Sequence, residues 1–162
     1  MLSHVDQHGN ARMVNVSRKR ATMRQAIVQG IVTLSREAFV ALQRASLEKG
    51  DALTVAKLAG IQAAKRTAEL IPLAHPLPIE HLEVTFSPEE TSCCVRVTAT
   101  AVTTAKTGIE LEAFVAAAIA ALALYDMIKA VDPGAKVTDL ALIKKTGGRQ
   151  PFRRDVPCEQ PS

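Results

Sequence analysis

An alanine-rich stretch from Lys106 to Val131 constrains the fold of this chain more than any other segment. Its sequence, KTGIELEAFVAAAIAALALYDMIKAV, is apolar on nearly every side of a helix, a pattern typical of a buried helix. Thr107 is a candidate N-cap, with Glu110 three residues later as in a capping box. Asp132-Pro133-Gly134 ends the helix. The sequence therefore predicts one long buried helix against which the rest of the chain packs.

Asp126 and Lys129 place a carboxylate and an ammonium near the end of this apolar helix. At i, i+3 spacing the two side chains share a face. Desolvation favours the neutral form of a lysine, whereas an adjacent carboxylate favours its charged form. The pair is either a structural ion pair or an acid–base site, and the residue types alone leave both interpretations open.

The composition indicates a globular domain suited to an anionic ligand. At 162 residues, with 48% apolar and 22% charged residues, the chain is long enough for one domain with a substantial core. The net charge of +4 suits an anionic small molecule as well as nucleic acid. Only 3% of the residues are aromatic, which argues against a platform for stacked bases. The three cysteines, Cys93, Cys94 and Cys158, show no CxxC spacing, which favours free thiols.

The sequence shows neither an apolar stretch long enough to span a membrane nor an apolar signal region. The longest charge-free stretch of the alanine-rich helix, 113–125, has 13 residues, too few to span a bilayer. The first ten residues, MLSHVDQHGN, contain no apolar signal region. We therefore expect a cytoplasmic protein without membrane contact.

The remaining segments carry helix and strand signals in blocks. We expect strands over 12–17, 20–34, 79–86, 94–102 and 136–143, helices over 36–47 and 51–70, and a rigid proline-containing loop over 71–78. Ser35 and Asp51 are the expected N-caps, and Gly30 marks an irregularity in its strand. Because 79–86 and 94–102 resemble an antiparallel hairpin, we predict an α+β fold with helices on one face of a mostly antiparallel sheet. Residues 1–10 and 150–162 are expected to be flexible or disordered, with one domain over 11–149.

Four further features are candidates for chemistry, each with a plainer alternative. His75 is either a proton-transfer or ligand-binding group held by flanking prolines, or a loop histidine bonded to backbone. Lys49 is either an ammonium near an anion-binding helix N-terminus or a solvated charge. Glu110 and Glu112 lie about 200° apart around a helix, so only one faces a given cleft. Residues 144–149, KKTGGR, form either an anion nest or a solvated basic end.

Taken together, these segments resemble one family. The matching runs are MVNVS (13–17), KGD (49–51), AGIQAAKRT (59–67), LIPLAHPL (70–77), KTGIELEA (106–113), YDMIKAV (125–131) and KKTGG (144–148). Their order and spacing resemble the molybdenum cofactor biosynthesis protein C family, the cyclic pyranopterin monophosphate synthases. The resemblance covers about residues 3 to 149.

The resemblance implies a ferredoxin-like α+β fold, a single catalytic domain and a homohexamer built as a trimer of dimers with interfacial active sites. It implies a lyase that takes the cyclised dihydro-GTP made by a radical-SAM GTP cyclase. The product is cyclic pyranopterin monophosphate, released together with pyrophosphate. It implies no resident cofactor or protein-bound metal, and leaves open a Mg²⁺ ion carried by the substrate triphosphate.

The resemblance also assigns residues. It implies that Asp126, Lys129 and Lys49 are catalytic. The substrate-contacting segments match Leu73, Ala74, His75, Leu111 and Glu112, and further pocket positions match Arg24, Lys65, Glu110 and Lys145. The chain departs from the family where Asn15 replaces the usual Asp, and where Ala74 replaces a common Cys. Ala74 is compatible with the family if that position contributes backbone.

Two other function classes compete with the synthase. A non-catalytic nucleotide- or RNA-binding module would use the basic end at 144–149 to hold phosphates, although scarce aromatics argue against RNA. A purely structural oligomer would leave the His75 loop and the Asp126–Lys129 pair without a role. Turnover of the nucleotide separates the first alternative from an enzyme.

Overall fold

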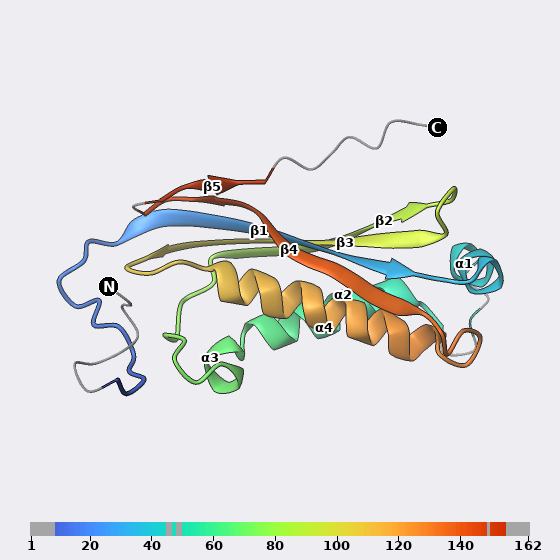
Figure 1. Cartoon of the computed structure of the whole chain (residues 1–162), viewed down its shortest axis with the longest axis horizontal. Helices are drawn as coiled ribbons and strands as arrows, with labels where there is room; N and C mark the ends of the chain where they lie inside the picture. Colours follow the sequence, from blue (N-terminus) through green and yellow to red (C-terminus); the bar gives the residue numbers. More distant parts are fainter. Residues whose placement is uncertain (1–8, 45–46, 48–49, 149, 155–162) are drawn as a thin grey trace.

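The computed structural model describes residues 9–44, 47, 50–148 and 150–154. Within these residues one antiparallel sheet of five strands has the order β2-β3-β1-β4-β5, and the long helices lie on one of its faces (Figure 1). The elements are β1 Thr22–Thr33, α1 Arg36–Gln43, α2 Ala52–Ala64, α3 Thr67–Leu70, β2 His81–Glu89, β3 Cys94–Ala105, α4 Glu110–Ile128, β4 Lys136–Thr146 and β5 Phe152–Arg153. This arrangement confirms the predicted α+β, ferredoxin-like class.

Strand β1 lies inside the sheet, between β3 and β4. It pairs with β3 without interruption, from Thr22 opposite Ala105 to Thr33 opposite Cys94. Ala26, Val28 and Val32 alternate toward the helices and are fully buried, as expected for a sheet with one covered face. The pairing with β4 shifts register between Gln29 and Ile31, which confirms the irregularity predicted at Gly30.

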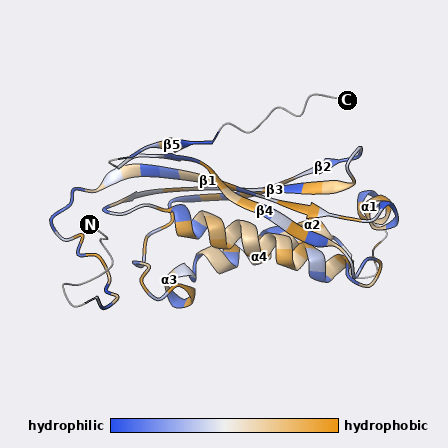
Figure 2. Cartoon of the chain, viewed as in Figure 1, coloured by the Kyte–Doolittle hydropathy of each residue, from blue (hydrophilic) through white to orange (hydrophobic). Residues whose placement is uncertain are grey.

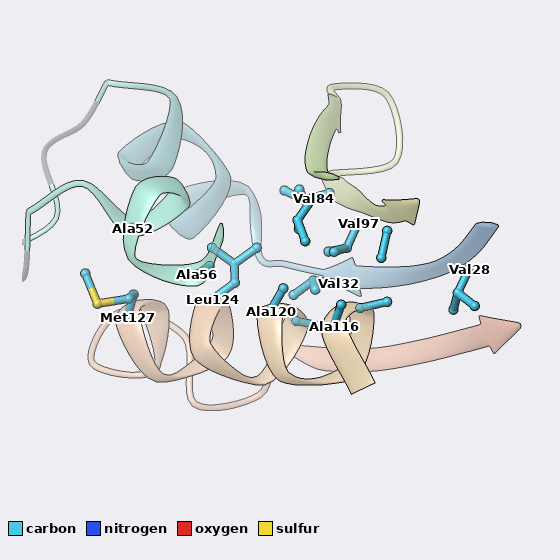
Figure 3. Packing of buried hydrophobic residues seen from close by; sticks show 14 of the residues in the cluster. Val28, Val32, Ala52, Ala56, Val84, Val97, Ala116, Ala120, Leu124 and Met127 are labelled. Carbon is cyan, nitrogen blue, oxygen red and sulfur yellow. The ribbon is translucent and has the colours of Figure 1, made fainter. Parts of the chain in front are cut away.

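Helices α2 and α4 pack closely because small side chains line their contact. Gly60 of α2 lies so close to α4 that an added Cβ would come 2.6 Å from the carbonyl oxygen of Ala116. The two helices run antiparallel, with Ala52 and Ala56 near Met127 and Leu124 (Figure 3). The start of α2 therefore lies beside the C-terminal end of α4.

Helix α4 is apolar along most of its length (Figure 2). Among the described residues it alone is long and apolar enough to cross a membrane by length and composition. Half of its apolar window is nevertheless buried inside the fold, against β1, β3 and α2. Its composition is accounted for by a position in the core of the protein.

Some predicted boundaries were wrong. The expected strand over 12–17 is irregular apart from an isolated bridge at Ala11, because the segment lies against the 71–78 loop instead of a sheet edge, with the Val14 carbonyl bonded to His75. Thr107 is not the cap of α4: the helix begins at Glu110, with Ile109 at the N-cap and no side-chain cap bond. Thr107 instead lines a cavity at this end of the helix.

Other boundaries moved by a few residues. The helix expected over 51–70 is broken at Lys65–Arg66 into α2 and α3, and the helix expected over 36–47 ends at Gln43. Ser35 and Asp51 do cap their helices, accepting hydrogen bonds from the backbone N–H groups of Ala38 and Thr54. The segment expected to be disordered, 150–162, contains β5, which pairs with β4 through Phe152 and Arg153.

We predict that Gly60→Ala destabilises the fold although alanine is the better helix former. The added methyl group would also come 2.9 Å from the Cβ of Ala120, so the helices must separate. Overpacking costs about 1–3 kcal/mol, more than the gain of up to about 1 kcal/mol from helix propensity. Thermal unfolding should give a lower Tm for Gly60→Ala and an unchanged one for Gln62→Ala, at an exposed position of the same helix. A Gly60→Ala chain as stable as wild type would contradict the close contact.

Candidate active site

The predicted site residues gather at the two ends of α4. His75, Glu110 and Glu112 lie at its N-terminal end, whereas Asp126 and Lys129 lie at its C-terminal end. At a rise of 1.5 Å per residue, Glu110 and Asp126 are about 24 Å apart along the axis. Each end is described in turn below.

A cavity of about 380 Å³ opens at the N-terminal end of α4. Its walls come from the segment after residue 13, the 71–78 loop and the start of the helix. The lining residues include Val14, Val16, Lys19, Leu73, Ala74, His75, Leu77, Thr107, Gly108, Glu110, Leu111 and Glu112. All five positions matched to substrate-contacting segments are therefore brought together. Apolar side chains together with several convergent polar groups are typical of a small-molecule site.

The ring of His75 is anchored in this cavity by backbone. Its Nε2 atom lies 2.8 Å from the carbonyl oxygen of Val14. Because a carbonyl can only accept, Nε2 is the protonated nitrogen, and Nδ1 of the neutral ring is an acceptor. The bond to backbone is therefore confirmed for His75, and the ring also lines the cavity, whereas a role in ligand binding or proton transfer stays a prediction.

Glu112 is a buried carboxyl group in the same cavity. It is 4% exposed, and its Oε2 atom has no hydrogen-bond partner within the described part of the chain. Burial raises the pKa of Glu112, and the nearby charge of Glu110 raises it further, against a smaller opposing effect of the Glu112 backbone N–H. The structure therefore makes ionisation of Glu112 less favourable than that of an exposed glutamate.

A second cavity, of about 470 Å³, adjoins the first and is rich in cations. Its lining includes Lys19, Arg24, Gln25, Gly108, Ile109, Glu110, Lys145, Thr146, Gly147, Gly148 and Gln150. Lys19, Gly108 and Glu110 line both cavities. The two spaces are therefore compartments of one continuous region.

The backbone conformation of the second cavity explains why glycine occupies positions 147 and 148. Gly147 and Gly148 have φ values of +77° and +79°, a conformation that favours glycine. A Cβ on Gly147 would collide with the Met23 carbonyl, and one on Gly148 with the Arg24 guanidinium. Successive backbone N–H groups in such a turn, beside Arg24 and Lys145, are suited to binding an anion. In this structure Lys145 Nζ lies 3.2 Å from Glu110 Oε1.

Asp126 and Lys129 form an ion pair at the other end of α4. Lys129 Nζ lies 2.8 Å from Asp126 Oδ1, and both side chains are about half exposed, at 51% and 55%. The hydrogen bond and charge of Asp126 raise the pKa of Lys129. The desolvation that the sequence suggested for this lysine is outweighed in the single chain by the contact with Asp126, so the ammonium form is favoured.

Of the two remaining predicted residues, one lies outside the described part of the chain and the other lines neither cavity. Lys49 lies outside the described residues; Asp51, two positions later, caps the start of α2 and accepts the Thr54 N–H at 3.0 Å. That start lies beside the end of α4 that carries Lys129 (Figure 1). Lys65 is exposed at the end of α2 and is not among the lining residues of either cavity.

Sequence reasoning missed Lys19 and Gly108, which line both cavities. A Cβ on Gly108 would overlap the carboxylate of Glu110, so glycine lets that side chain fold back toward Lys145. The signal for Gly108 was its place just before the helix. The signal for Lys19 was only the basic run 18–20. Within the described residues no group of three or more His, Cys, Asp or Glu side chains could hold a metal ion.

The chain belongs to the MoaC family, whose model matches residues 13–148. It is 48% identical over 148 residues to a cyclic pyranopterin monophosphate synthase of Thermomicrobium roseum, covering 91% of this chain and 89% of the relative. It is 46% identical to the protein of the same name from Heliobacterium modesticaldum, covering 91% and 93%. It is also 46% identical to cyclic pyranopterin monophosphate synthase 2 of Mycobacterium tuberculosis, covering 92% and 88%.

We predict that Glu112→Gln stabilises the folded chain in a pH-dependent way. Because folding raises the pKa of Glu112, the wild-type chain loses stability as pH rises above the unfolded pKa of this group. Below the unfolded pKa, roughly 4.3, the two chains should differ least. The advantage of Glu112→Gln should grow as pH rises through the folded pKa and then level off.

Urea unfolding between pH 4 and pH 8 measures this difference in the free energy of unfolding. The matched control is Glu110→Gln, which removes a carboxylate that is paired with Lys145 and should not gain stability with rising pH. If the stability advantage of Glu112→Gln shrinks with rising pH, the folded state lowers the pKa of Glu112 instead of raising it, which would contradict the prediction.

Proposed function

We propose that this chain is a cyclic pyranopterin monophosphate synthase. The reaction converts 3',8-cyclo-7,8-dihydroguanosine 5'-triphosphate to cyclic pyranopterin monophosphate and releases pyrophosphate, in molybdenum cofactor biosynthesis. Membership of a family with synthases at 46–48% identity supports this assignment. The structural observation that carries it is a cationic compartment that continues into a second cavity lined by His75 and Glu112. These compartments match the phosphates and the fused ring of one nucleotide.

The cationic compartment is suited to the triphosphate. Arg24 and Lys145 would neutralise phosphate oxygens, and the backbone N–H groups of 147–148 would bind them directly. Arg24 is held in place by a 3.0 Å hydrogen bond from Nε to the Ala105 carbonyl. Lys145 would exchange Glu110 for phosphate on binding. Cations that hold phosphates in the ground and transition states alike contribute mainly to substrate affinity.

The Asp126–Lys129 pair is suited to proton transfer. The pair sets the protonation state from which the reaction begins, because the raised pKa of Lys129 makes it an ammonium and therefore a proton donor. Asp126 holds the ammonium in one orientation through their 2.8 Å contact. Lys49 is the second acid–base group that we propose. No resident cofactor is needed for this rearrangement, and a Mg²⁺ ion accompanying the triphosphate is compatible with it.

The separation of the two clusters supports an active site shared between subunits. One nucleotide bound at the N-terminal end of α4 cannot also contact Lys129, which lies about 28 Å from Glu110 along the same helix axis. A second chain can supply the missing end. Leu58 of α2 and Leu122 of α4 are 58% and 56% exposed, and such residues suit contacts between subunits. We propose a homohexamer, a trimer of dimers, in the cytoplasm, acting after a radical-SAM GTP cyclase.

A non-catalytic nucleotide- or RNA-binding module is the alternative. It would account for the cationic compartment at Arg24 and Lys145 but not for the acid–base pair. Family membership does not favour it, and no observation on the structure favours it over the synthase.

We predict that wild-type protein releases pyrophosphate from the cyclised nucleotide and that Lys129→Ala lowers kcat by about a hundred- to ten-thousand-fold. Alanine has no proton to transfer. Lys129→Arg should not rescue turnover, because a guanidinium stays protonated and cannot give up its proton to the substrate. A pyrophosphate assay, with circular dichroism to confirm folding, measures both. Exposed Lys57→Ala is the control. An active Lys129→Arg enzyme would reduce the pair to a structural role.

We predict that two defective chains restore activity when mixed. One carries Lys129→Ala and the other carries Arg24→Ala with Lys145→Ala, so each retains one end of the proposed shared site. In randomly mixed oligomers about a quarter of the shared sites combine two intact ends. Pyrophosphate release at limiting substrate should rise accordingly.

Mixing wild type with the triple variant, which carries all three substitutions, is the matched control. Shared sites give about a quarter of wild-type activity in this mixture too, whereas sites within one chain give about half. No recovery in the first mixture, together with half activity in the second, would place the whole site in a single chain.

A further inference from the structure

One side chain, Asp132, ties the turn that follows α4 to a distant part of the chain. Its Oδ2 atom accepts the backbone N–H of Ser35 at 2.6 Å, and its Oδ1 atom accepts the backbone N–H of Gly134 at 3.1 Å. Ser35 is 97 residues away in the sequence and directly precedes α1, so this contact joins the end of α4 to the start of α1 (Figure 1). Both carboxylate oxygens of Asp132 are therefore used, one within its own turn and one across to another element.

The contact with Ser35 completes the cap of α1 from outside that helix. The Ser35 hydroxyl accepts the Ala38 N–H at 3.2 Å, which is one half of a capping box. In a capping box the other half is a Glu or Gln at the third helical position, whose side chain accepts the N–H of the cap residue. Ala38 holds that position here and has no side-chain acceptor, and Asp132 accepts the N–H instead. The helix dipole of α1 also favours a carboxylate at this place.

Lys129 lies between two anchored points of the backbone. Before it, the side chain of Ile128 is fully buried, and the Ile128 carbonyl accepts the N–H groups of Val131 and Asp132 at 2.8 and 3.0 Å. After it, the side chain of Asp132, three residues further along, is bonded to Ser35. The backbone at Lys129 is therefore held from both sides, and one of these two anchors depends on the carboxylate of Asp132.

We propose that Asp132 is a positioning residue for Lys129: by tying the turn after α4 to the start of α1, it holds the ammonium beside Asp126 in the orientation that proton transfer requires. This inference rests on the proposed function, which makes Lys129 the proton donor. Lys129 Nζ and Asp126 Oδ1 are 2.8 Å apart although both side chains are about half exposed, so the backbone that carries them, more than burial, fixes their geometry. A displacement of about 1 Å in a reacting group can cost about a hundredfold in rate.

The contribution of Asp132 should appear in kcat and not in KM. The cations that we propose for the phosphates, Arg24 and Lys145, line the cavity at the other end of α4. Loss of the Asp132 contacts leaves that cavity untouched and disturbs only the end of the helix that carries Lys129. We therefore expect substrate affinity to be unchanged and the proton-transfer step to be slower.

Pyrophosphate release from the cyclised nucleotide by Asp132→Ala measures this effect, with circular dichroism and light scattering to confirm folding and assembly. Its kcat should fall by about ten- to a hundredfold at unchanged KM. Asp132→Asn keeps one of the two acceptor oxygens and the shape of the side chain, so its kcat should lie between those of wild type and Asp132→Ala. If Asp132→Ala does not fold, the same fall in kcat at unchanged KM is required of Asp132→Asn, and a wild-type kcat in that chain would overturn the inference.

The matched control is Ser35→Ala. It removes the side-chain half of the same helix cap and keeps the backbone N–H that Asp132 accepts. Ser35→Ala should therefore lower Tm and leave kcat per folded enzyme unchanged. If Asp132→Ala likewise lowers Tm at unchanged kcat, the contact only stabilises the fold and the inference is overturned.

Crystal structures of these two variants give a second readout that needs no turnover. In Asp132→Ala the Lys129 ammonium should be displaced from Asp126, or adopt more than one position, because one anchor of its backbone is lost. In Ser35→Ala the 2.8 Å contact should remain. An unmoved Lys129 in Asp132→Ala would overturn the inference.

The two readouts separate this inference from the proposed function. If wild type releases pyrophosphate, either an unmoved Lys129 or an unchanged kcat in Asp132→Ala would overturn the inference and leave the synthase assignment standing. If wild type releases none, the synthase assignment is overturned. A Lys129 displaced in Asp132→Ala and not in Ser35→Ala would then still support the positioning of Lys129 by Asp132.

Discussion

The packing of α4 against the sheet and α2 determines where polar chemistry can occur in this protein. The contact uses glycine and alanine, and at Gly60 it leaves no room even for a methyl group. Because the middle of α4 is buried by this contact, charged side chains are confined to its two ends. The site residues are therefore grouped by helix geometry, about 24 Å apart along one axis. Closer packing in the core thus leads directly to a divided set of functional groups.

At the N-terminal end, small shifts in solvent exposure give similar residues different roles. Glu110 reaches solvent and Lys145, and a glycine at 108 makes space for its carboxylate. Glu112 lies on another side of the same turn, is buried and has no counter-ion among the described residues. The helix dipole acts on both and cannot explain the difference in surroundings. Burial raises the pKa of Glu112, whereas Glu110 pairs with Lys145, so the side of the helix on which a carboxylate lies decides its environment.

The sequence predicted the parts of the structure that depend on local patterns. The alanine run predicted the buried helix, Ser35 and Asp51 predicted two caps, and Gly30 predicted the register shift against β4. The errors occurred where tertiary contacts replaced local ones. Residues 12–17 alternate like a strand, yet the Val14 carbonyl is bonded to the ring of His75. Thr107 has the pattern of a cap, yet it lines the cavity and the helix starts later.

The sequence named most of the residues discussed for the candidate site, but it did not predict how they are arranged in space. Family motifs named His75, Glu112 and Lys145. His75 and Lys145 are about 70 residues apart in the sequence, and no local pattern predicts that they line adjoining cavities. Lys19 was missed because a basic run is usually a solvated surface. The burial of Glu112 could not be predicted from the sequence either. The i, i+2 spacing shows that the two carboxylates point to different sides of the helix, and the surrounding fold decides which one is buried.

Assembly changes the chemistry that the Asp126–Lys129 pair can perform. In a single chain the pair is half exposed, and water together with Asp126 keeps Lys129 protonated. Covering the pair with a second subunit removes that water and makes both charges more costly, while leaving their mutual attraction in place. Transfer of the proton from Lys129 would leave Asp126 as an unpaired buried carboxylate, which is costly unless the proton neutralises an anionic atom of the bound substrate. In the shared site that we propose, the contact that completes the site therefore ties proton transfer to the charge of the substrate atom that receives the proton.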